Sequence, residues 1–142
     1  MRLPSWATDL PEEEERTRRI VFQRLLAGEA ISLRGEGLLP GTLIEEGRIV
    51  LDDAGEWVVA AAGLSTVPTK HEMWIAGRRF YASCAFDTVG IPAALEAPAQ
   101  VRSACGFCNE VIELELPTAL SRTDLRVWLC EEQVGSSFVA DT

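Results

Sequence analysis

Between residues 48 and 116 the chain is divided into short apolar segments by turn-forming glycine, proline, aspartate and asparagine residues. Segments of this length suit β-strands, whereas helices need longer periodic stretches. Tight turns between consecutive strands favour antiparallel pairing, so we expect a mainly antiparallel sheet. A further strand is expected nearer the end of the sequence. The predicted strands span residues 48–51, 56–62, 64–68, 71–75, 78–81, 99–104, 110–116 and 125–130.

Two helices are predicted to flank this sheet. The first spans about residues 10–27, where four consecutive glutamates at the start favour the helix dipole and the charged run EEEERTRR is expected to be a solvated face. The second is a short helix from about Cys84 to Val89, ended by Gly90 and Pro92. The predicted fold class is α+β, with an N-terminal helix and β-hairpin resembling a reduced winged-helix unit. We expect this region at residues 1–66 and a second region, which contains all four cysteines, at residues 67–142.

Charge and hydropathy exclude several classes of partner. The net charge is −9 and no basic face is concentrated in the sequence, which argues against nucleic acid and anionic membrane surfaces as partners. No apolar stretch approaches the roughly 20 residues that span a bilayer. The first residues lack the charged-then-apolar pattern of a signal peptide, so we expect a cytoplasmic protein. The sequence does not predict an oligomeric state.

The segment Cys84-Ala-Phe-Asp87 is the strongest candidate for a reactive site. Residues three apart on a helix share a face, so the thiol and the carboxyl group can meet there. A helix N-terminus lowers a thiol pKa, which favours the nucleophilic and metal-binding thiolate. A neighbouring carboxyl group can transfer a proton to or from a reacting atom. The alternative is a buried cysteine beside a capping or surface aspartate.

A second cysteine motif, Cys105-Gly-Phe-Cys108, falls on a predicted turn between two strands. The spacing suits a zinc knuckle, but zinc normally requires four ligands, which Cys84 and Cys130 would have to complete. The alternative is a pair of turn cysteines that bind nothing. The single histidine, His71, is expected to be a partly exposed strand residue rather than a ligand.

The segment GRRFYASCAFDTVGIPAAL resembles the part of the alkylmercury (organomercurial) lyase family that contains the catalytic cysteine and aspartate. The positions that fit are Tyr81, Ala82, Cys84, Ala85, Asp87, Thr88 and Pro92. The segments RIVLDDAG, GLSTVPTKHEM and VRSAC are also similar to the family. Ser83 departs from the pattern, because the family usually has tryptophan before the catalytic cysteine.

The resemblance implies cleavage of a carbon–mercury bond. Soft mercury prefers thiolate ligands, so two sulfurs would bind the metal while an aspartic acid protonates the leaving carbon. By position Cys84 is the first thiolate and Asp87 the proton carrier, and Cys105 matches a cysteine usually regarded as structural. The family's second catalytic cysteine lies in a C-terminal segment, and the candidates for it here are Cys108 and Cys130.

The resemblance also implies which ligands to expect. No cofactor is required, mercury being the metal of the substrate and product. The expected partners are a small organometallic substrate and cellular thiols. Two alternatives remain. One is a non-catalytic protein that binds or senses zinc, copper or mercury, with Cys84, Cys105, Cys108 and Cys130 as candidate ligands. The other is a cysteine-dependent enzyme acting on another small molecule.

Overall fold

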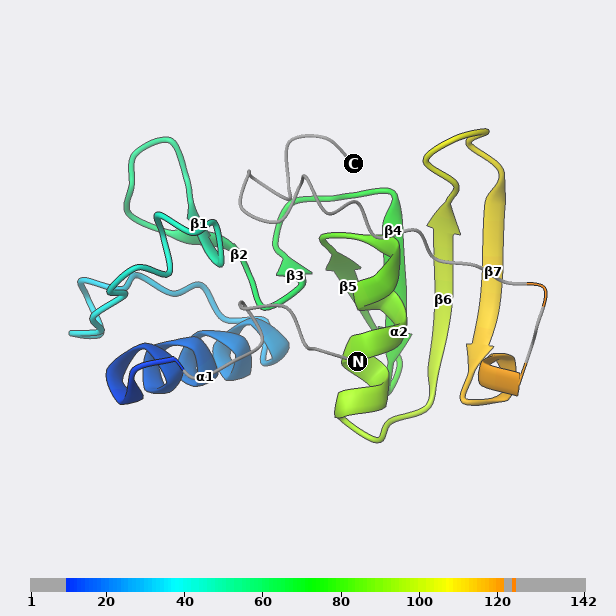
Figure 1. Cartoon of the computed structure of the whole chain (residues 1–142), viewed down its shortest axis with the longest axis horizontal. Helices are drawn as coiled ribbons and strands as arrows, with labels where there is room; N and C mark the ends of the chain where they lie inside the picture. Colours follow the sequence, from blue (N-terminus) through cyan, green and yellow to red (C-terminus); the bar gives the residue numbers. More distant parts are fainter. Residues whose placement is uncertain (1–9, 122–123, 125–142) are drawn as a thin grey trace.

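A computed structural model of the chain describes residues 10–121 and residue 124. It contains two α-helices, a short 3-10 helix and one seven-stranded sheet in the order β1-β2-β3-β5-β4-β6-β7, in which all neighbouring strands are antiparallel (Figure 1). The elements are α1 (Glu12–Leu26), β1 (Ile49–Leu51), β2 (Val58–Ala61), β3 (Leu64–Ser65), β4 (His71–Ile75), β5 (Arg78–Ala82), α2 (Ala85–Ala94), β6 (Ala99–Ala104), β7 (Val111–Leu116) and η2 (Thr118–Ser121).

The predicted α+β class is confirmed, and so are the strands predicted between residues 48 and 116. The predicted bounds of β4 and β6 are the observed ones. The largest difference is at β3, which was predicted at 64–68 and is only two residues long in the structure. The strand predicted at residues 125–130 lies outside the described residues. The sheet is continuous through β3, which pairs with β2 on one side and β5 on the other. The division into regions at residues 66 and 67 stays a prediction.

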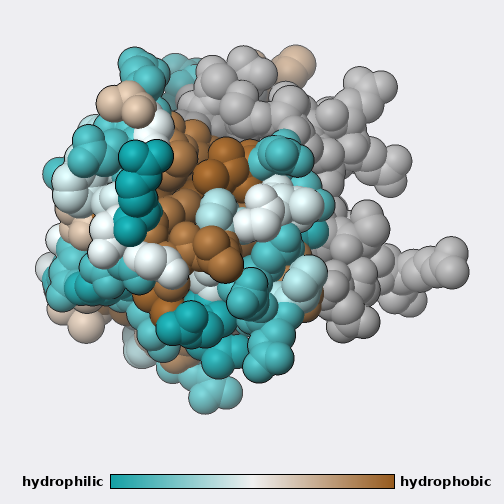
Figure 2. Space-filling model, turned by 90° about the vertical axis from the view of Figure 1, so that its left-hand side faces the viewer, coloured by the Kyte–Doolittle hydropathy of each residue, from teal (hydrophilic) through white to brown (hydrophobic). Residues whose placement is uncertain are grey.

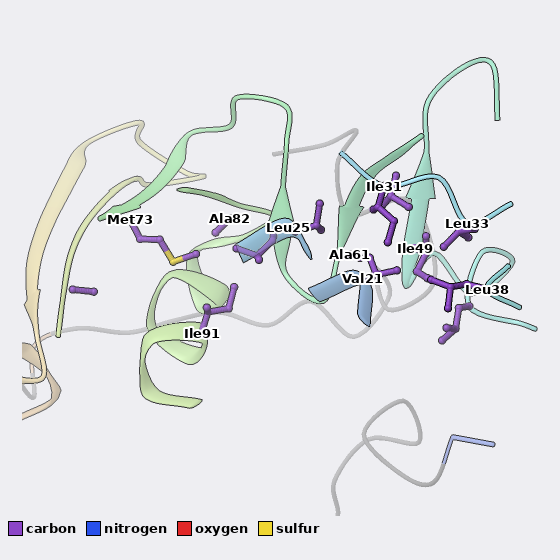
Figure 3. Close-up of a cluster of buried hydrophobic side chains, with 14 of the residues drawn as sticks. Val21, Leu25, Ile31, Leu33, Leu38, Ile49, Ala61, Met73, Ala82 and Ile91 are labelled. Atoms are coloured by element: carbon purple, nitrogen blue, oxygen red, sulfur yellow. The ribbon is translucent and has the colours of Figure 1, made fainter. Parts of the chain in front are cut away.

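Helix α2 covers one face of the sheet, in front of β4 and β5 (Figure 1). Alternate residues of the strands point to this face, because side chains along a strand alternate between its two sides. Met73 of β4 and Val101 of β6 are buried there, and Ile91 of α2 packs into the same apolar cluster. The cluster continues to Val21 and Leu25 (Figure 3) in α1, which lies beside β2 and β3 at the other end of the sheet (Figure 1).

Helix α2 is longer than the sequence predicts. It continues through Gly90 and Pro92 to Ala94 instead of ending at Val89. Proline removes one backbone donor and normally interrupts a helix. Here Ile91 and Pro92 are both buried, and we attribute the continuation of the helix to their burial against the sheet, which favours helix over local propensity.

The charged face predicted for α1 is not uniformly solvated. Glu14 is buried, and its carboxylate accepts hydrogen bonds from the backbone N–H (2.7 Å) and the hydroxyl (3.2 Å) of Thr42. Gly41 lies so close to this carboxylate that a Cβ atom on it would stand 2.0 Å from Glu14 Oε1. Glu14 therefore attaches the segment 40–47 to the helix, while Glu15 pairs with Arg18 at the surface.

Apolar side chains gather on the end of the molecule at the left of Figure 1, ringed by hydrophilic ones (Figure 2). In the segment 30–47 the exposed large apolar residues are Leu39 and Ile44.

Among the residues described, no helix has the length and apolar character needed to cross a bilayer.

We expect Glu14→Ala to lower the free energy of unfolding by about 1.5–3 kcal/mol, because it removes hydrogen bonds to a buried carboxylate. Glu13→Ala removes an exposed glutamate from the adjacent position and should change stability by less than about 0.5 kcal/mol. Urea denaturation of the two variants compares them. Equal losses would contradict the role assigned to Glu14.

Candidate active site

The reactive residues lie along one edge of the sheet. Strands β5 and β6 both pair antiparallel with β4, so they are parallel to each other and end at the same edge. Cys84 follows the end of β5, and Cys105 follows the end of β6. His71 begins β4 at this same edge, between them. The two cysteines therefore follow strands two positions apart, roughly 9–10 Å between strand axes.

Cys84 and Asp87 form a direct side-chain pair. Cys84 is the N-cap residue of α2 and Asp87 lies in its first turn, which places both side chains on one face of the helix. The Cys84 thiol donates a hydrogen bond to Asp87 Oδ2 at 3.0 Å. Both residues are half-buried. The contact expected from the spacing is present.

The low thiol pKa predicted for Cys84 is not found, although the helix N-terminus acts on it in the predicted direction. The pKa of Cys84 is raised to about 12, first by burial and then by the charge and hydrogen bond of Asp87. The backbone N–H groups of Phe86 and Asp87 lower this pKa, but burial and the neighbouring carboxylate outweigh them. Burial also raises the pKa of Asp87 above its usual value. The pair therefore retains a proton at neutral pH, and that proton lies between sulfur and oxygen.

The turn between β2 and β3 fixes the position of the Asp87 carboxyl group. Ala62 and Gly63 both have positive φ, at 50° and 84°, as the two central residues of a type I′ hairpin turn require. A Cβ atom on Gly63 would stand 2.6 Å from Asp87 Oδ1. The Gly63 carbonyl accepts a hydrogen bond from Ser83 N–H at 2.8 Å, which holds the turn beside the residue preceding Cys84.

Gly63 belongs to the site although no motif in the sequence pointed to it. The available signal was Gly63 itself, because a glycine between two apolar segments indicates a turn. The sequence could not predict which side chain the turn would meet, because Gly63 and Asp87 come together only when β3 pairs with β5.

Cys105 and Cys108 lie in the turn between β6 and β7, as predicted. Cys105 is half-buried, Cys108 is exposed, and neither forms a disulfide. Within residues 10–121 and 124, no three His, Cys, Asp or Glu side chains come together as a group that could hold a metal ion. The described structure thus does not bring Cys84, Cys105 and Cys108 to one metal site. Cys130, the other candidate ligand and thiol, lies outside the described residues.

His71 is buried, which corrects the expectation of a partly exposed strand histidine. Its Nδ1 lies 2.7 Å from the hydroxyl of Ser103, the residue opposite it on β6, and this hydroxyl is also buried. Burial lowers the pKa of His71, so the neutral imidazole is favoured. The two buried polar side chains thus satisfy each other's hydrogen-bonding groups, at the same edge of the sheet as Cys84.

The chain is similar to known proteins in sequence and in fold. The sequence profile of the alkylmercury lyase family matches residues 64–134, which include Cys84 and Asp87. Alkylmercury lyases of Bacillus cereus and Clostridium butyricum are each 30% identical over 106 residues, covering 69% of this chain and 48% of theirs. The solved mercury-bound form of MerB2 superposes with a TM-score of 0.66 at 28% identity, over 76% of this chain and 57% of that one. This chain thus spans about half the length of the curated relatives.

We expect Asp87→Asn to lower the pKa of the Cys84 thiol, because it removes the charge that opposes ionisation. Burial remains, so the pKa should stay above the ordinary value of 9.0. The rate of iodoacetamide alkylation at Cys84, followed by peptide mass spectrometry as pH rises, reports this change. The Cys105–Cys108 peptide in the same digest is the internal control. An unchanged profile at Cys84 would show that Asp87 does not act on the thiol.

We expect Gly63→Ala to destabilise the protein more than Gly55→Ala. Both glycines have positive φ, at 84° and 69°, so alanine at either position should cost about 1–2 kcal/mol of backbone strain. A Cβ atom on Gly55 would meet nothing within 4 Å, whereas one on Gly63 would collide with the Asp87 carboxyl group. Urea denaturation measures both losses. If they are equal, the carboxyl group is not held against the turn.

Proposed function

This chain belongs to the alkylmercury lyase family, and we propose that it cleaves the carbon–mercury bond of organomercurial compounds, with Cys84 binding mercury and Asp87 donating the proton. The observation that best supports this function is the hydrogen bond of 3.0 Å between the Cys84 thiol and Asp87 Oδ2. It joins a ligand for a soft metal to a group able to accept and return a proton. A buried structural cysteine would not need an ionisable partner in such a contact.

In the first step the Cys84 sulfur displaces X from R–Hg–X. The sulfur–mercury bond forms, the Hg–X bond breaks and X leaves as an anion, while the thiol proton moves to the Asp87 carboxylate. The thiol pKa of about 12 means that mercury must displace this proton, because the free thiolate is scarce at neutral pH. Asp87 already accepts the hydrogen bond, so the proton has a short path. Burial raises the carboxyl pKa and so stabilises the neutral acid that results.

In the second step a second sulfur binds mercury as a thiolate, its own proton having passed to solvent, and the carbon–mercury bond breaks. Its electron pair stays with carbon, which takes the proton from Asp87 and leaves as R–H. Mercury remains as the divalent ion bound to two sulfurs, and Asp87 returns to the carboxylate. Two electron-rich sulfurs on the metal favour this cleavage because they increase electron density toward the carbon.

The second sulfur can come from Cys130 or from a cellular thiol. Cys108 is a weaker candidate, because it lies with Cys105 in the β6–β7 turn, and that turn follows a strand two positions from β5. A cellular thiol would also deliver the substrate as a mercury–thiol adduct and remove the mercuric product. No resident metal or organic cofactor enters either step.

We expect the purified full chain to release benzene from phenylmercuric acetate in the presence of excess thiol. Asp87→Asn should lower the rate by at least about 100-fold, because it removes the proton donor. Cys84→Ser should abolish turnover, since a hydroxyl group is a poor ligand for mercury. Gas chromatography of the released hydrocarbon measures the rates.

Asp52→Asn is the matched control. It makes the same chemical change in the exposed turn between β1 and β2, where Asp52 accepts hydrogen bonds from the backbone N–H of Glu56 and Trp57. This variant should keep the full rate of hydrocarbon release. Absence of hydrocarbon from a wild-type chain that still binds phenylmercury would exclude lyase activity and favour a binding function.

A further inference from the structure

We propose that the β6–β7 turn is a separate two-thiol site that binds the mercuric ion through Cys105 and Cys108. The site differs from the Cys84–Asp87 pair in position and chemistry, since the partner of its first thiol is a second thiol and not a carboxyl group. The choice of mercury as the ligand rests on the proposed function, whose product is this ion. The inference that the two thiols form a metal-binding site does not depend on that function.

The backbone of the turn brings the two cysteines together. Cys105 N–H donates to the carbonyl of Glu110 at 2.8 Å, and Asn109 N–H donates to the carbonyl of Cys105 at 2.9 Å. Asn109 has a φ of 62°, a left-handed conformation that reverses the chain directly after Cys108. These contacts close a compact loop, and the thiol of Cys108 interacts with that of Cys105.

The turn also favours the ionised form of Cys105. Hydrogen bonding from the backbone N–H groups of Cys108 and Phe107, together with the Cys108 thiol, lowers the pKa of Cys105 and outweighs burial and the charge of Glu110, which raise it. Backbone dipoles that stabilise a thiolate prepare it for a metal, because the thiolate is the binding form. Cys84 has the opposite surroundings, with a buried thiol beside a carboxylate.

The turn is accessible to an incoming metal complex. Cys108 is exposed and the Phe107 side chain is completely exposed, so within the described structure nothing covers this side of the loop. Cys105 and Cys84 follow strands that end at the same edge of the sheet. A mercuric ion released from Cys84 would therefore leave at the edge where this second pair of thiols stands.

Two sulfurs suit mercury better than zinc. Zinc in a structural site takes four ligands, and no group of three candidate ligands forms among the residues described. The mercuric ion is soft and satisfied by two thiolates in a linear arrangement. Each new Hg–S bond releases the proton of a turn thiol and breaks one Hg–S bond to an outgoing thiol, which takes up that proton. The exchange involves no change of oxidation state.

The test uses the full chain with Cys84→Ser and Cys130→Ser, which retains Cys105 and Cys108. Mercuric chloride is added in the presence of a large excess of glutathione, and the metal retained after desalting is measured. We expect one mercury per chain. Adding Cys108→Ser to this background should weaken retention by at least about 100-fold, because the second bond is then intermolecular. Adding Cys105→Ser should have the same effect.

Two results would overturn the proposal. Equal retention by the two-thiol and single-thiol chains would show that the turn does not chelate mercury. Stoichiometric zinc in the wild-type chain, lost in Cys130→Ser, would assign the turn to a four-ligand zinc site instead. Circular dichroism checks that each variant folds, and the exposed Cys108 gives a substitution that leaves the core untouched. The test measures no turnover, so its failure and the failure of the lyase proposal are distinguishable.

Discussion

The two-residue strand β3 is the constraint on which the rest of the arrangement depends. Leu64 and Ser65 pair with β2 on one side and with β5 on the other, so they join the N-terminal hairpin to the larger part of the sheet. The same pairing brings the β2–β3 turn against the start of α2, where Gly63 contacts the Asp87 carboxyl group. Without β3 the chain would form two smaller sheets, and β2 and β5 would become edge strands with unpaired backbone groups. The candidate acid would also lose the backbone beside it.

The proposed chemistry follows from a balance between burial and charge at Cys84. A helix N-terminus by itself would favour the thiolate, but burial and Asp87 raise the thiol pKa to about 12. A thiol of this kind is a weak general nucleophile and still a good ligand for a metal that can displace its proton. The neighbouring carboxyl group accepts that proton, and its own raised pKa helps to hold it. At the Cys105–Cys108 turn the balance is reversed, because backbone N–H groups and the Cys108 thiol lower the pKa of Cys105.

Local patterns in the sequence predicted the elements well where short-range rules decide them. The turn residues at 52–55 and 105–109 separate strands that the structure confirms, and α1 differs from its predicted bounds by one or two residues. The failures have a common cause. Pro92 was expected to end a helix, Glu14 to face solvent, and His71 to be partly exposed. In each case a partner distant in sequence changes the outcome: the sheet under α2, Thr42 opposite Glu14, and Ser103 opposite His71.

The sequence by itself determined the α+β class and the order of the strands along the chain. It also determined the contact between Cys84 and Asp87, because residues three positions apart on a helix lie on the same face. The tertiary structure decided the protonation of that pair, because burial and neighbouring charge exist only after folding. It also decided that Gly63 stands against the acid and that Cys84 and Cys105 share an edge of the sheet. These relations depend on which strands pair, and strand pairing joins residues too far apart in sequence for any local pattern to specify.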